Sequence, residues 1–117
     1  MKNTITRREA LLGSLISGSY LGLRAMATGN PAGALELSGD TDDLFYDAAR
    51  QRILAICGEG FVDVLSKEQD TFHRVTCFAT APGARTGLFV PERSELFVAV
   101  PHRGSQRAEV RILAVKD

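Results

Sequence analysis

Short apolar runs separated by polar turns occupy most of the chain after about residue 34. The runs are rich in Val, Ile, Leu and Phe, and several alternate apolar and polar residues, which is typical of β-strands. They predict strands at Ala34–Ser38, Leu44–Tyr46, Ile53–Cys57, Phe61–Leu65, Phe72–Phe78, Arg85–Val90, Leu96–Val100 and Glu109–Val115. The intervening segments are polar and predict a tight turn at 58–60, a hairpin loop at 66–71 and a longer loop at 102–108. The pattern therefore predicts an all-β chain with antiparallel strands.

One strand–turn–strand segment occurs twice, at residues 44–56 and again at 88–100. The copies are 44 residues apart at Leu44 and Leu88 but 43 apart at Ile53 and Leu96, which indicates one deletion in the turn. Four short strands repeated roughly every 40–45 residues are typical of the blades of a β-propeller. The repeat predicts one four-stranded blade at about 42–79 and a partial blade at about 85–117, within a domain that covers 34–117.

Two blades cannot close a ring, because propellers need about four to eight. Each blade also needs a neighbour on both flanks to bury its faces. Ala34–Ser38 stands where the outermost strand of a preceding blade would lie, and the partial blade needs such a strand. Either this segment pairs with the last blade of another copy, or the chain is a marginal fragment. We therefore expect self-association, or association with another propeller-type chain.

The first 27 residues follow a different pattern, in which Arg7 and Arg8 precede an apolar run at 11–23. The run is shorter than the ~20 residues that span a bilayer, and its length is typical of a signal peptide. Small residues predict cleavage at Ala25–Ala27, or alternatively at Ala32–Ala34, with a linker at 28–33. The segment resembles a twin-arginine export signal. The resemblance implies a signal helix at 1–27, a periplasmic or secreted location, and only transient contact with the membrane.

Two alternatives remain for this segment: an uncleaved anchor, or a basic amphipathic helix on a cytoplasmic protein. Overall composition is that of a globular protein, with 44% hydrophobic and 24% charged residues and a net charge of zero. Without residues 1–27 the chain has ten basic and thirteen acidic residues, a net charge of −3. This acidic balance and the absence of Trp argue against nucleic-acid binding.

Several segments resemble blades of bacterial exported YVTN-type β-propeller repeat proteins. The similar segments are Asp42–Asp47, Cys57–Val64, Ala81–Pro91 and Leu96–Pro101, and the resemblance covers residues 34–115. It implies antiparallel four-stranded blades around a central channel. Such proteins usually have more blades than this chain can hold, so an activity that needs a closed channel is not expected from one copy.

Polar residues at the starts of the predicted innermost strands would line one mouth of such a channel, the usual ligand site of the fold. Arg85 and Thr86 lie one repeat after Thr41 and Asp42, and a nearby loop contributes two further candidates. The candidate ligand-binding residues are Asp42, Arg85, Thr86, His102 and Arg103. Asp42 and Arg85 could instead form a salt bridge between neighbouring blades.

The remaining chemistry-bearing residues predict no catalytic centre, no metal site and no cofactor. Cys57 and Cys77 are separated by the third strand, and two strand spacings of about 9–10 Å exceed the ~7 Å limit for a disulfide. We therefore expect two buried free thiols. His73 lies on the predicted outermost strand, and we expect it to be solvated. The aspartates at 40–43 lack the Gly and Glu of a calcium loop. No nucleophile elbow or phosphate-binding loop is present.

These observations favour an exported β-propeller-like module that binds or scaffolds other chains and has no catalytic activity of its own. One alternative is a fragment or subunit of an exported propeller enzyme, such as a dehydrogenase or a lactonase-like protein. Another is a truncated gene product without independent function. Fold class alone does not decide between these possibilities.

Overall fold

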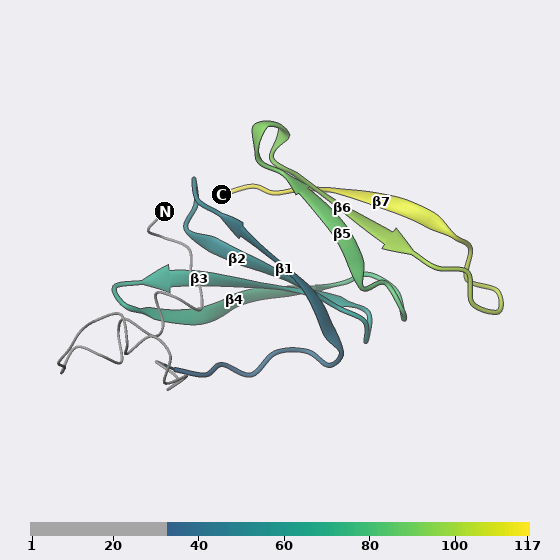
Figure 1. Cartoon of the computed structure of the whole chain (residues 1–117), viewed down its shortest axis with the longest axis horizontal. Coiled ribbons are helices and arrows are strands. Elements are labelled where there is room, and N and C mark those ends of the chain that lie inside the picture. Colours follow the sequence, from purple (N-terminus) through teal and green to yellow (C-terminus); the bar gives the residue numbers. More distant parts are fainter. Residues whose placement is uncertain (1–32) are drawn as a thin grey trace, which may run out of the picture. The chain divides into compact units, whose positions relative to one another are not determined.

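The computed structural model describes residues 33–117, where the chain forms two antiparallel β-sheets (Figure 1). Sheet A has the strand order β1-β2-β3-β4, and sheet B has the order β5-β6-β7. Their bounds are β1 Thr41–Asp47, β2 Arg52–Cys57, β3 Phe61–Glu68, β4 Thr71–Ala79, β5 Thr86–Val90, β6 Glu95–Val100 and β7 Glu109–Ala114. A 3₁₀ turn, η2 (Pro91–Arg93), joins β5 to β6. The prediction of an all-β, antiparallel chain is confirmed.

The predicted signal helix at 1–27, with Arg7 and Arg8, lies outside the described residues, as does most of the linker at 28–33. Leu37–Asp117 forms one compact unit that contains both sheets. In residues 33–117, no helix has the length and apolar character that crossing a membrane would require.

Two of the predicted elements differ from the structure. The hairpin loop expected at 66–71 is only a two-residue turn, because β3 continues to Glu68 and β4 begins at Thr71. The polar residues after Leu65 lie at the end of β3, where backbone pairing with β4 rather than burial of their side chains stabilises the strand. The strand expected at Ala34–Ser38 is absent: this segment has no partner strand, and Ser38 begins the bend that leads into β1.

The β1–β2 and β5–β6 hairpins have the same strand register at an offset of 43, which corrects the offset of 44 expected at Leu44. Both have four-residue turns, and the last turn residue has a positive φ in each: 53° at Gln51 and 52° at Ser94. The strand pairs that close the turns are Asp47 with Arg52, and Val90 with Glu95. Leu88 therefore corresponds to Phe45 rather than to Leu44. A shift of one residue moves a side chain to the other face of a strand.

The third strands of the two sheets correspond at a larger offset. Three residues join β2 to β3, whereas eight residues join β6 to β7, so the offset grows by five, from 43 to 48. Cross-strand pairing agrees with this value: Ile56 pairs with Val62 in sheet A, and Ala99 pairs with Val110 in sheet B. Val62 and Val110 are thus equivalent positions.

The core lies between the sheets. Sheet A contributes side chains from β2 and β3, sheet B contributes side chains from β5 and β6, and the connection between the sheets adds two alanines. The buried members are Leu54, Ile56, Val62, Val64, Ala81, Ala84, Phe89, Leu96, Val98 and Val100. Burying one large aliphatic or aromatic side chain stabilises the fold by about 1.5–3 kcal/mol. This core holds the two sheets face to face.

The face of β3 that is directed away from sheet B is not solvent-exposed either, although a strand with alternating residues usually has one wet face. Val62 and Val64 face sheet B, but Asp63 and Leu65, which point to the opposite face, are also buried. Ser38 lies against Asp63 on that side. Strand β3 is therefore buried on both faces, although its sequence alternates.

Candidate functional site

Loops gather at one end of the two sheets, where β1, β3, β5 and β7 begin. We call this the loop end, and its loops are 38–40, 58–60, 80–85 and 101–108. The backbone N–H of Gly58 donates to the carbonyl of Asp40 at 2.7 Å, and the N–H of Gly83 donates to the carbonyl of Gly58 at 2.7 Å. Two short backbone hydrogen bonds thus join the first three loops.

An ion pair links the two sheets at the loop end, but its acidic partner is not the expected one. A guanidinium nitrogen of Arg85 lies 2.7 Å from a carboxylate oxygen of Asp40, so the expected pair with Asp42 is wrong. Asp40 has a φ of 61°, and this turn places its side chain beside Gly58 and Arg85. Asp42 and Thr86 lie exposed near the starts of β1 and β5. Asp43 makes a second link by accepting the N–H of Gly87 at 3.0 Å.

The long loop brings Arg103 to the same end. The side-chain amide of Gln106 donates to the carbonyls of Pro82 (3.0 Å) and Pro101 (2.8 Å), which ties this loop to the connection between the sheets. The guanidinium of Arg103 lies over Gly83, where an added Cβ would come within 2.6 Å of its Nε. His102 is exposed beside it. All five candidate residues, Asp42, Arg85, Thr86, His102 and Arg103, therefore lie at the loop end.

Three charged side chains at the loop end, those of Asp40, Glu59 and Arg85, have protein partners. Arg85 pairs with Asp40, and a Glu59 carboxylate oxygen accepts the N–H of Gly39 at 3.0 Å. Within residues 33–117, no group of three or more His, Cys, Asp or Glu side chains could hold a metal ion. The arrangement is suited to locking the loops together and to presenting His102 and Arg103 to solvent.

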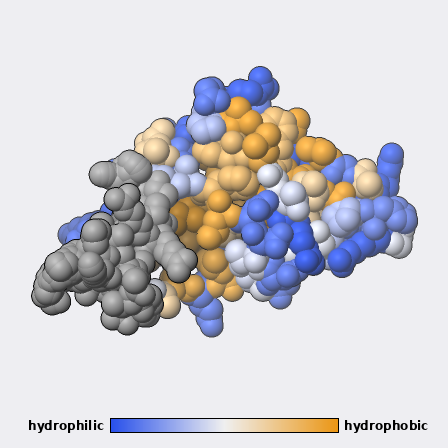
Figure 2. All heavy atoms as spheres, viewed as in Figure 1, coloured by the Kyte–Doolittle hydropathy of each residue, from blue (hydrophilic) through white to orange (hydrophobic). Residues whose placement is uncertain are grey.

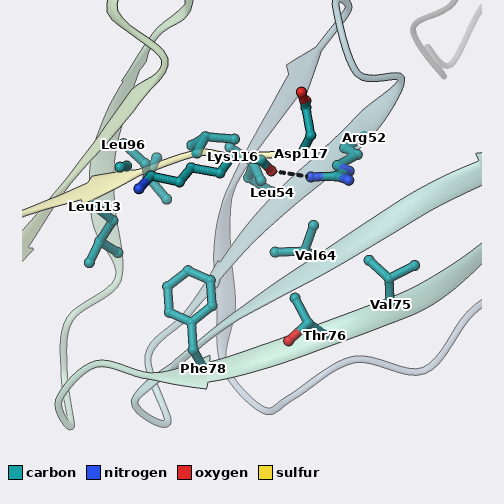
Figure 3. A pocket seen from close by; sticks show the side chains of 12 residues that line it. Arg52, Leu54, Val64, Val75, Thr76, Phe78, Leu96, Leu113, Lys116 and Asp117 are labelled. Atoms are coloured by element: carbon teal, nitrogen blue, oxygen red, sulfur yellow. Dashed lines mark hydrogen bonds between the residues drawn. The ribbon is translucent and has the colours of Figure 1, made fainter.

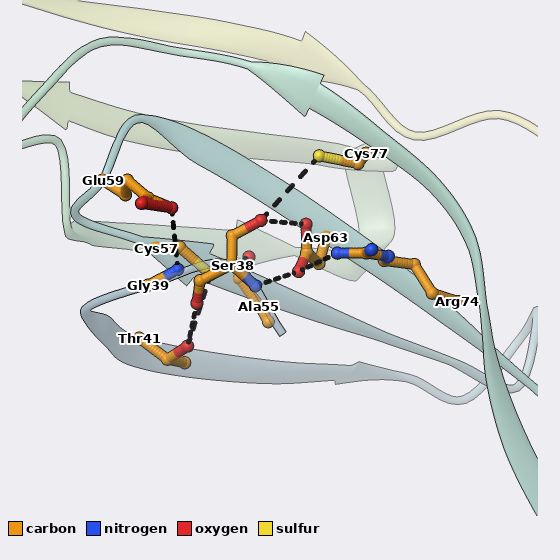
Figure 4. Close-up of polar contacts among 9 residues, drawn as sticks. All are labelled: Ser38, Gly39, Thr41, Ala55, Cys57, Glu59, Asp63, Arg74 and Cys77. Carbon is orange, nitrogen blue, oxygen red and sulfur yellow. Dashed lines mark hydrogen bonds and ion pairs between the residues drawn. The ribbon is translucent and has the colours of Figure 1, made fainter. Parts of the chain in front are cut away.

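Asp63 is a completely buried carboxylate that sequence reasoning missed (Figure 4). It accepts hydrogen bonds from the backbone N–H of Ser38 (2.7 Å), the hydroxyl of Ser38 (2.9 Å) and the guanidinium of Arg74 (3.1 Å). Burial by itself raises the pKa of Asp63, but the hydrogen bonds outweigh burial and hold the pKa below its usual range. Asp63 thus anchors the segment that enters β1.

The two cysteines lie on β2 and β4 with β3 between them, as predicted, and both are free. The hydroxyl oxygen of Thr41 is 3.3 Å from the sulfur of Cys57. Cys57 is buried as expected, but Cys77 is exposed because β4 is an end strand of sheet A. Burial raises the pKa of the Cys57 thiol, and partial desolvation together with the neighbouring Asp63 carboxylate raises the pKa of the Cys77 thiol, so the reactive thiolate form of both is disfavoured. His73 is exposed on β4, as predicted.

The outer face of sheet B, directed away from sheet A, is apolar and exposed. Leu88, Val110 and Ile112 are 58%, 62% and 58% exposed, and Phe97 and Ala99 lie between them in the strand register. Figure 2 shows hydrophobic side chains at the surface across the middle of the visible face, with hydrophilic ones around them. A cluster of exposed apolar side chains often marks an interaction surface.

A cleft of about 300 Å³ opens between β3–β4 of sheet A and β7 of sheet B (Figure 3). Val64, Val75 and Phe78 line one side, and Leu96 and Leu113 line the other. At its rim the guanidinium of Arg52 donates to the carbonyl of Lys116 at 2.6 Å. The cleft is therefore apolar inside and lies beside an end strand of sheet B.

Comparisons with protein-family models, with curated proteins and with solved structures found no match to this chain. Function is therefore inferred from the geometry of the chain itself.

Proposed function

We propose that the chain is an exported scaffold module of the β-propeller type, which binds other protein chains through the outer face of sheet B and catalyses no reaction. The observation that carries this proposal is the way the two sheets are stacked. Equivalent residues of the repeat do not face each other across the core, as they would in a symmetric sandwich. They point in the same direction, as in successive blades of a propeller.

The offset of 43 relates β1 and β2 to β5 and β6, and the offset of 48 relates β3 to β7, so the residues of these three strands of sheet A have defined counterparts in sheet B. Side chains that sheet A directs toward sheet B have counterparts on the outer face of sheet B. The pairs are Phe45 and Leu88, Leu54 and Phe97, Ile56 and Ala99, Val62 and Val110, and Val64 and Ile112. Sheet B thus offers to a further sheet the same surface that sheet A offers to sheet B.

Burial of the outer face of sheet B would remove several exposed apolar side chains from water. Val110 and Ile112 are 62% and 58% exposed, whereas their counterparts Val62 and Val64 are 0% and 6% exposed. Leu88 is 58% exposed, whereas its counterpart Phe45 packs partly buried against the core. Full burial of such a side chain contributes about 1.5–3 kcal/mol. Burial of these side chains by another sheet would therefore contribute favourably to the free energy of binding, which supports binding of another sheet there.

Two further features support the proposal. Asp40, Arg85 and Asp43 hold the two sheets together through the ion pair of Asp40 with Arg85 and the hydrogen bond of Asp43 with Gly87, so these three residues have a structural role that needs no ligand. The twin-arginine-like segment with Arg7 and Arg8 supports export to the periplasm or out of the cell.

The experiment is sedimentation equilibrium of the full chain at several concentrations, with Ile112→Lys as the test variant and Ser105→Lys as the matched control. Ser105 is exposed in the long loop, away from the strands. We expect wild type and Ser105→Lys to have masses above the 12.7 kDa of one chain, and Ile112→Lys to return to that mass. Equal masses for wild type and Ile112→Lys would contradict the proposal.

A further inference from the structure

The apolar cleft between sheet A and β7 is a candidate binding site that is separate from the loop end and from the outer face of sheet B. Its volume of about 300 Å³ is at the lower limit of small-molecule sites, which hold roughly 300–1,000 Å³. Val64 and Phe78 line it from sheet A, and Leu113 lines it from sheet B (Figure 3). Leu54 and Leu96 also line it and are 2% and 0% exposed. An apolar group that enters the cleft would therefore contact the core between the sheets.

A β-bulge in β4 adds apolar surface to the wall of the cleft. Val64 pairs with Thr76 and Leu65 pairs with Arg74, so Val75 has no pairing partner on β3. In a regular strand, Val75 and Thr76 would point to opposite faces, but a bulge redirects a side chain. Both residues line the cleft, and Val75 is 46% exposed. The bulge thus leaves nearly half of an apolar side chain available to a ligand.

One rim of the cleft is cationic. Arg52, Lys116 and Asp117 lie along this rim (Figure 3), but the carboxylate of Asp117 is paired with Arg50 at 2.9 Å. Neither Arg52 nor Lys116 forms an ion pair within residues 33–117. Arg52 donates to the carbonyl of Lys116 at 2.6 Å, which holds its guanidinium at the rim. Because a guanidinium has five N–H donors, the others can bind an anion.

We propose that the cleft binds a linear aliphatic carboxylate, with the chain inside the cleft and the carboxylate at the rim, where Arg52 and Lys116 lie. Each CH₂ that the cleft buries strengthens binding about fourfold. A guanidinium can bind a carboxylate through two parallel hydrogen bonds. A neutral chain lacks the contact at the rim, and a short anion lacks the contacts inside, so both features of the ligand are needed.

This site is independent of the surface proposed for binding other chains. Leu113 pairs with Leu96 and points toward sheet A, whereas the preceding residue, Ile112, points to the outer face. The inference therefore goes beyond the proposed scaffold function and does not rest on it. Because side chains of both sheets line the cleft, a ligand that occupies it would also stabilise their packing.

The experiment is titration calorimetry of the full chain with octanoate, decanoate, octanol and acetate. We expect one octanoate to bind per chain. Decanoate should bind up to about 15-fold more tightly, because it has two further CH₂ groups to bury. Octanol should bind more weakly than octanoate, and acetate should give no measurable binding. Failure of octanoate to bind would overturn the inference, as would octanol that binds as tightly as octanoate.

The test variant is Arg52→Gln, and the matched control is Arg107→Gln, in the exposed part of the long loop. Arg52→Gln should weaken octanoate binding about tenfold or more and leave octanol binding unchanged, which also shows that the cleft is intact. Arg107→Gln should bind both ligands as wild type does. Equal affinities of the two variants for octanoate would overturn the inference.

Val75→Glu is a second variant, which keeps the test decisive if Arg52→Gln does not fold. Val75 is half exposed on an end strand, so a longer side chain is accommodated there, and its carboxylate would repel that of the ligand. We expect Val75→Glu to weaken octanoate binding at least tenfold, and binding at wild-type affinity would overturn the inference. Ile112→Lys, on the outer face, should bind octanoate as wild type does. Loss of binding in that variant would place the ligand on the outer face and would also overturn the inference.

Discussion

Replacing the buried carboxylate of Asp63 gives the sharpest test of how sheet A holds the segment that enters β1. The substitution Asp63→Ala removes the acceptor of three hydrogen bonds, two from Ser38 and one from Arg74. It also leaves the N–H of Ser38 without its partner. Because Asp63 is 0% exposed, water cannot simply replace the lost carboxylate in the native packing.

The expected loss of stability follows from these contacts. Hydrogen bonds to a charged group contribute about 1.5–3 kcal/mol each, but Ser38 is partly exposed and regains some hydration when it is released. The side chain of Arg74 is 44% exposed, so its ion pair adds only about 0.2–1 kcal/mol after solvent screening. We expect a decrease of about 2–4 kcal/mol in the free energy of unfolding, a large part of the ~5–15 kcal/mol typical of a domain.

The effect should depend on pH with a defined sign. The pKa of Asp63 is lowered in the folded chain, whereas an unfolded Asp titrates near its ordinary value of about 3.9. Its contribution to stability is therefore complete above that ordinary pKa, and it is lost as the pH falls through the folded-state pKa. The difference between wild type and Asp63→Ala should be largest near neutral pH and should shrink in acid.

The assay is urea unfolding of the full chain, followed by circular dichroism at neutral and acidic pH. Asp42→Ala, which removes an exposed carboxylate near the start of β1, is the matched control and should change stability little. The reasoning fails if Asp63→Ala is no less stable than Asp42→Ala. It also fails if the gap between wild type and Asp63→Ala stays constant as the pH falls.

Three further results are expected. Gly60→Ala should lower the free energy of unfolding by about 1 kcal/mol or more. Gly60 has a φ of 115°, and an added Cβ would come within 3.2 Å of the backbone of the connection between the sheets. An unchanged midpoint of urea unfolding would contradict this. A thiol reagent should label Cys77 in the folded chain and Cys57 only after unfolding, and equal labelling rates would contradict the burial of Cys57. Arg50→Ala should lower the free energy of unfolding by about 1–3 kcal/mol, because it removes the ion pair at 3.0 Å from one oxygen of the buried Asp47 carboxylate, whose other oxygen keeps the N–H of Ala49. The same urea unfolding measures it, and no loss of stability would contradict this.

Local sequence patterns were sufficient to place the seven strands of the described chain. Apolar runs such as Ile53–Cys57 pair because their side chains fill the space between two sheets, and turn residues mark where they end. The repeat placed Arg85 and Thr86 in register with Thr41 and Asp42. These residues lie at the same end of the two sheets, because strands of a meander alternate in direction.

Features set by contacts between distant residues were not predictable from local patterns. The burial of Asp63 depends on Ser38, which lies 25 residues earlier, and nothing in the alternation of β3 signals it. The ion pair of Arg85 uses Asp40 because a positive φ turns that residue toward Gly58. The offset at Leu88 was wrong by one residue because similar apolar residues stand at 44 and 45, and only the strand register separates them.

The central claim is that the outer face of sheet B is covered by a further sheet. Hydrogen exchange of the backbone amides of β7, residues 109–114, tests it most directly. We predict that these amides exchange slowly in concentrated wild-type chain and rapidly in Ile112→Lys, while those of the central strand β2 stay protected in both. Equally rapid exchange of β7 in both proteins, at every concentration, would contradict the claim.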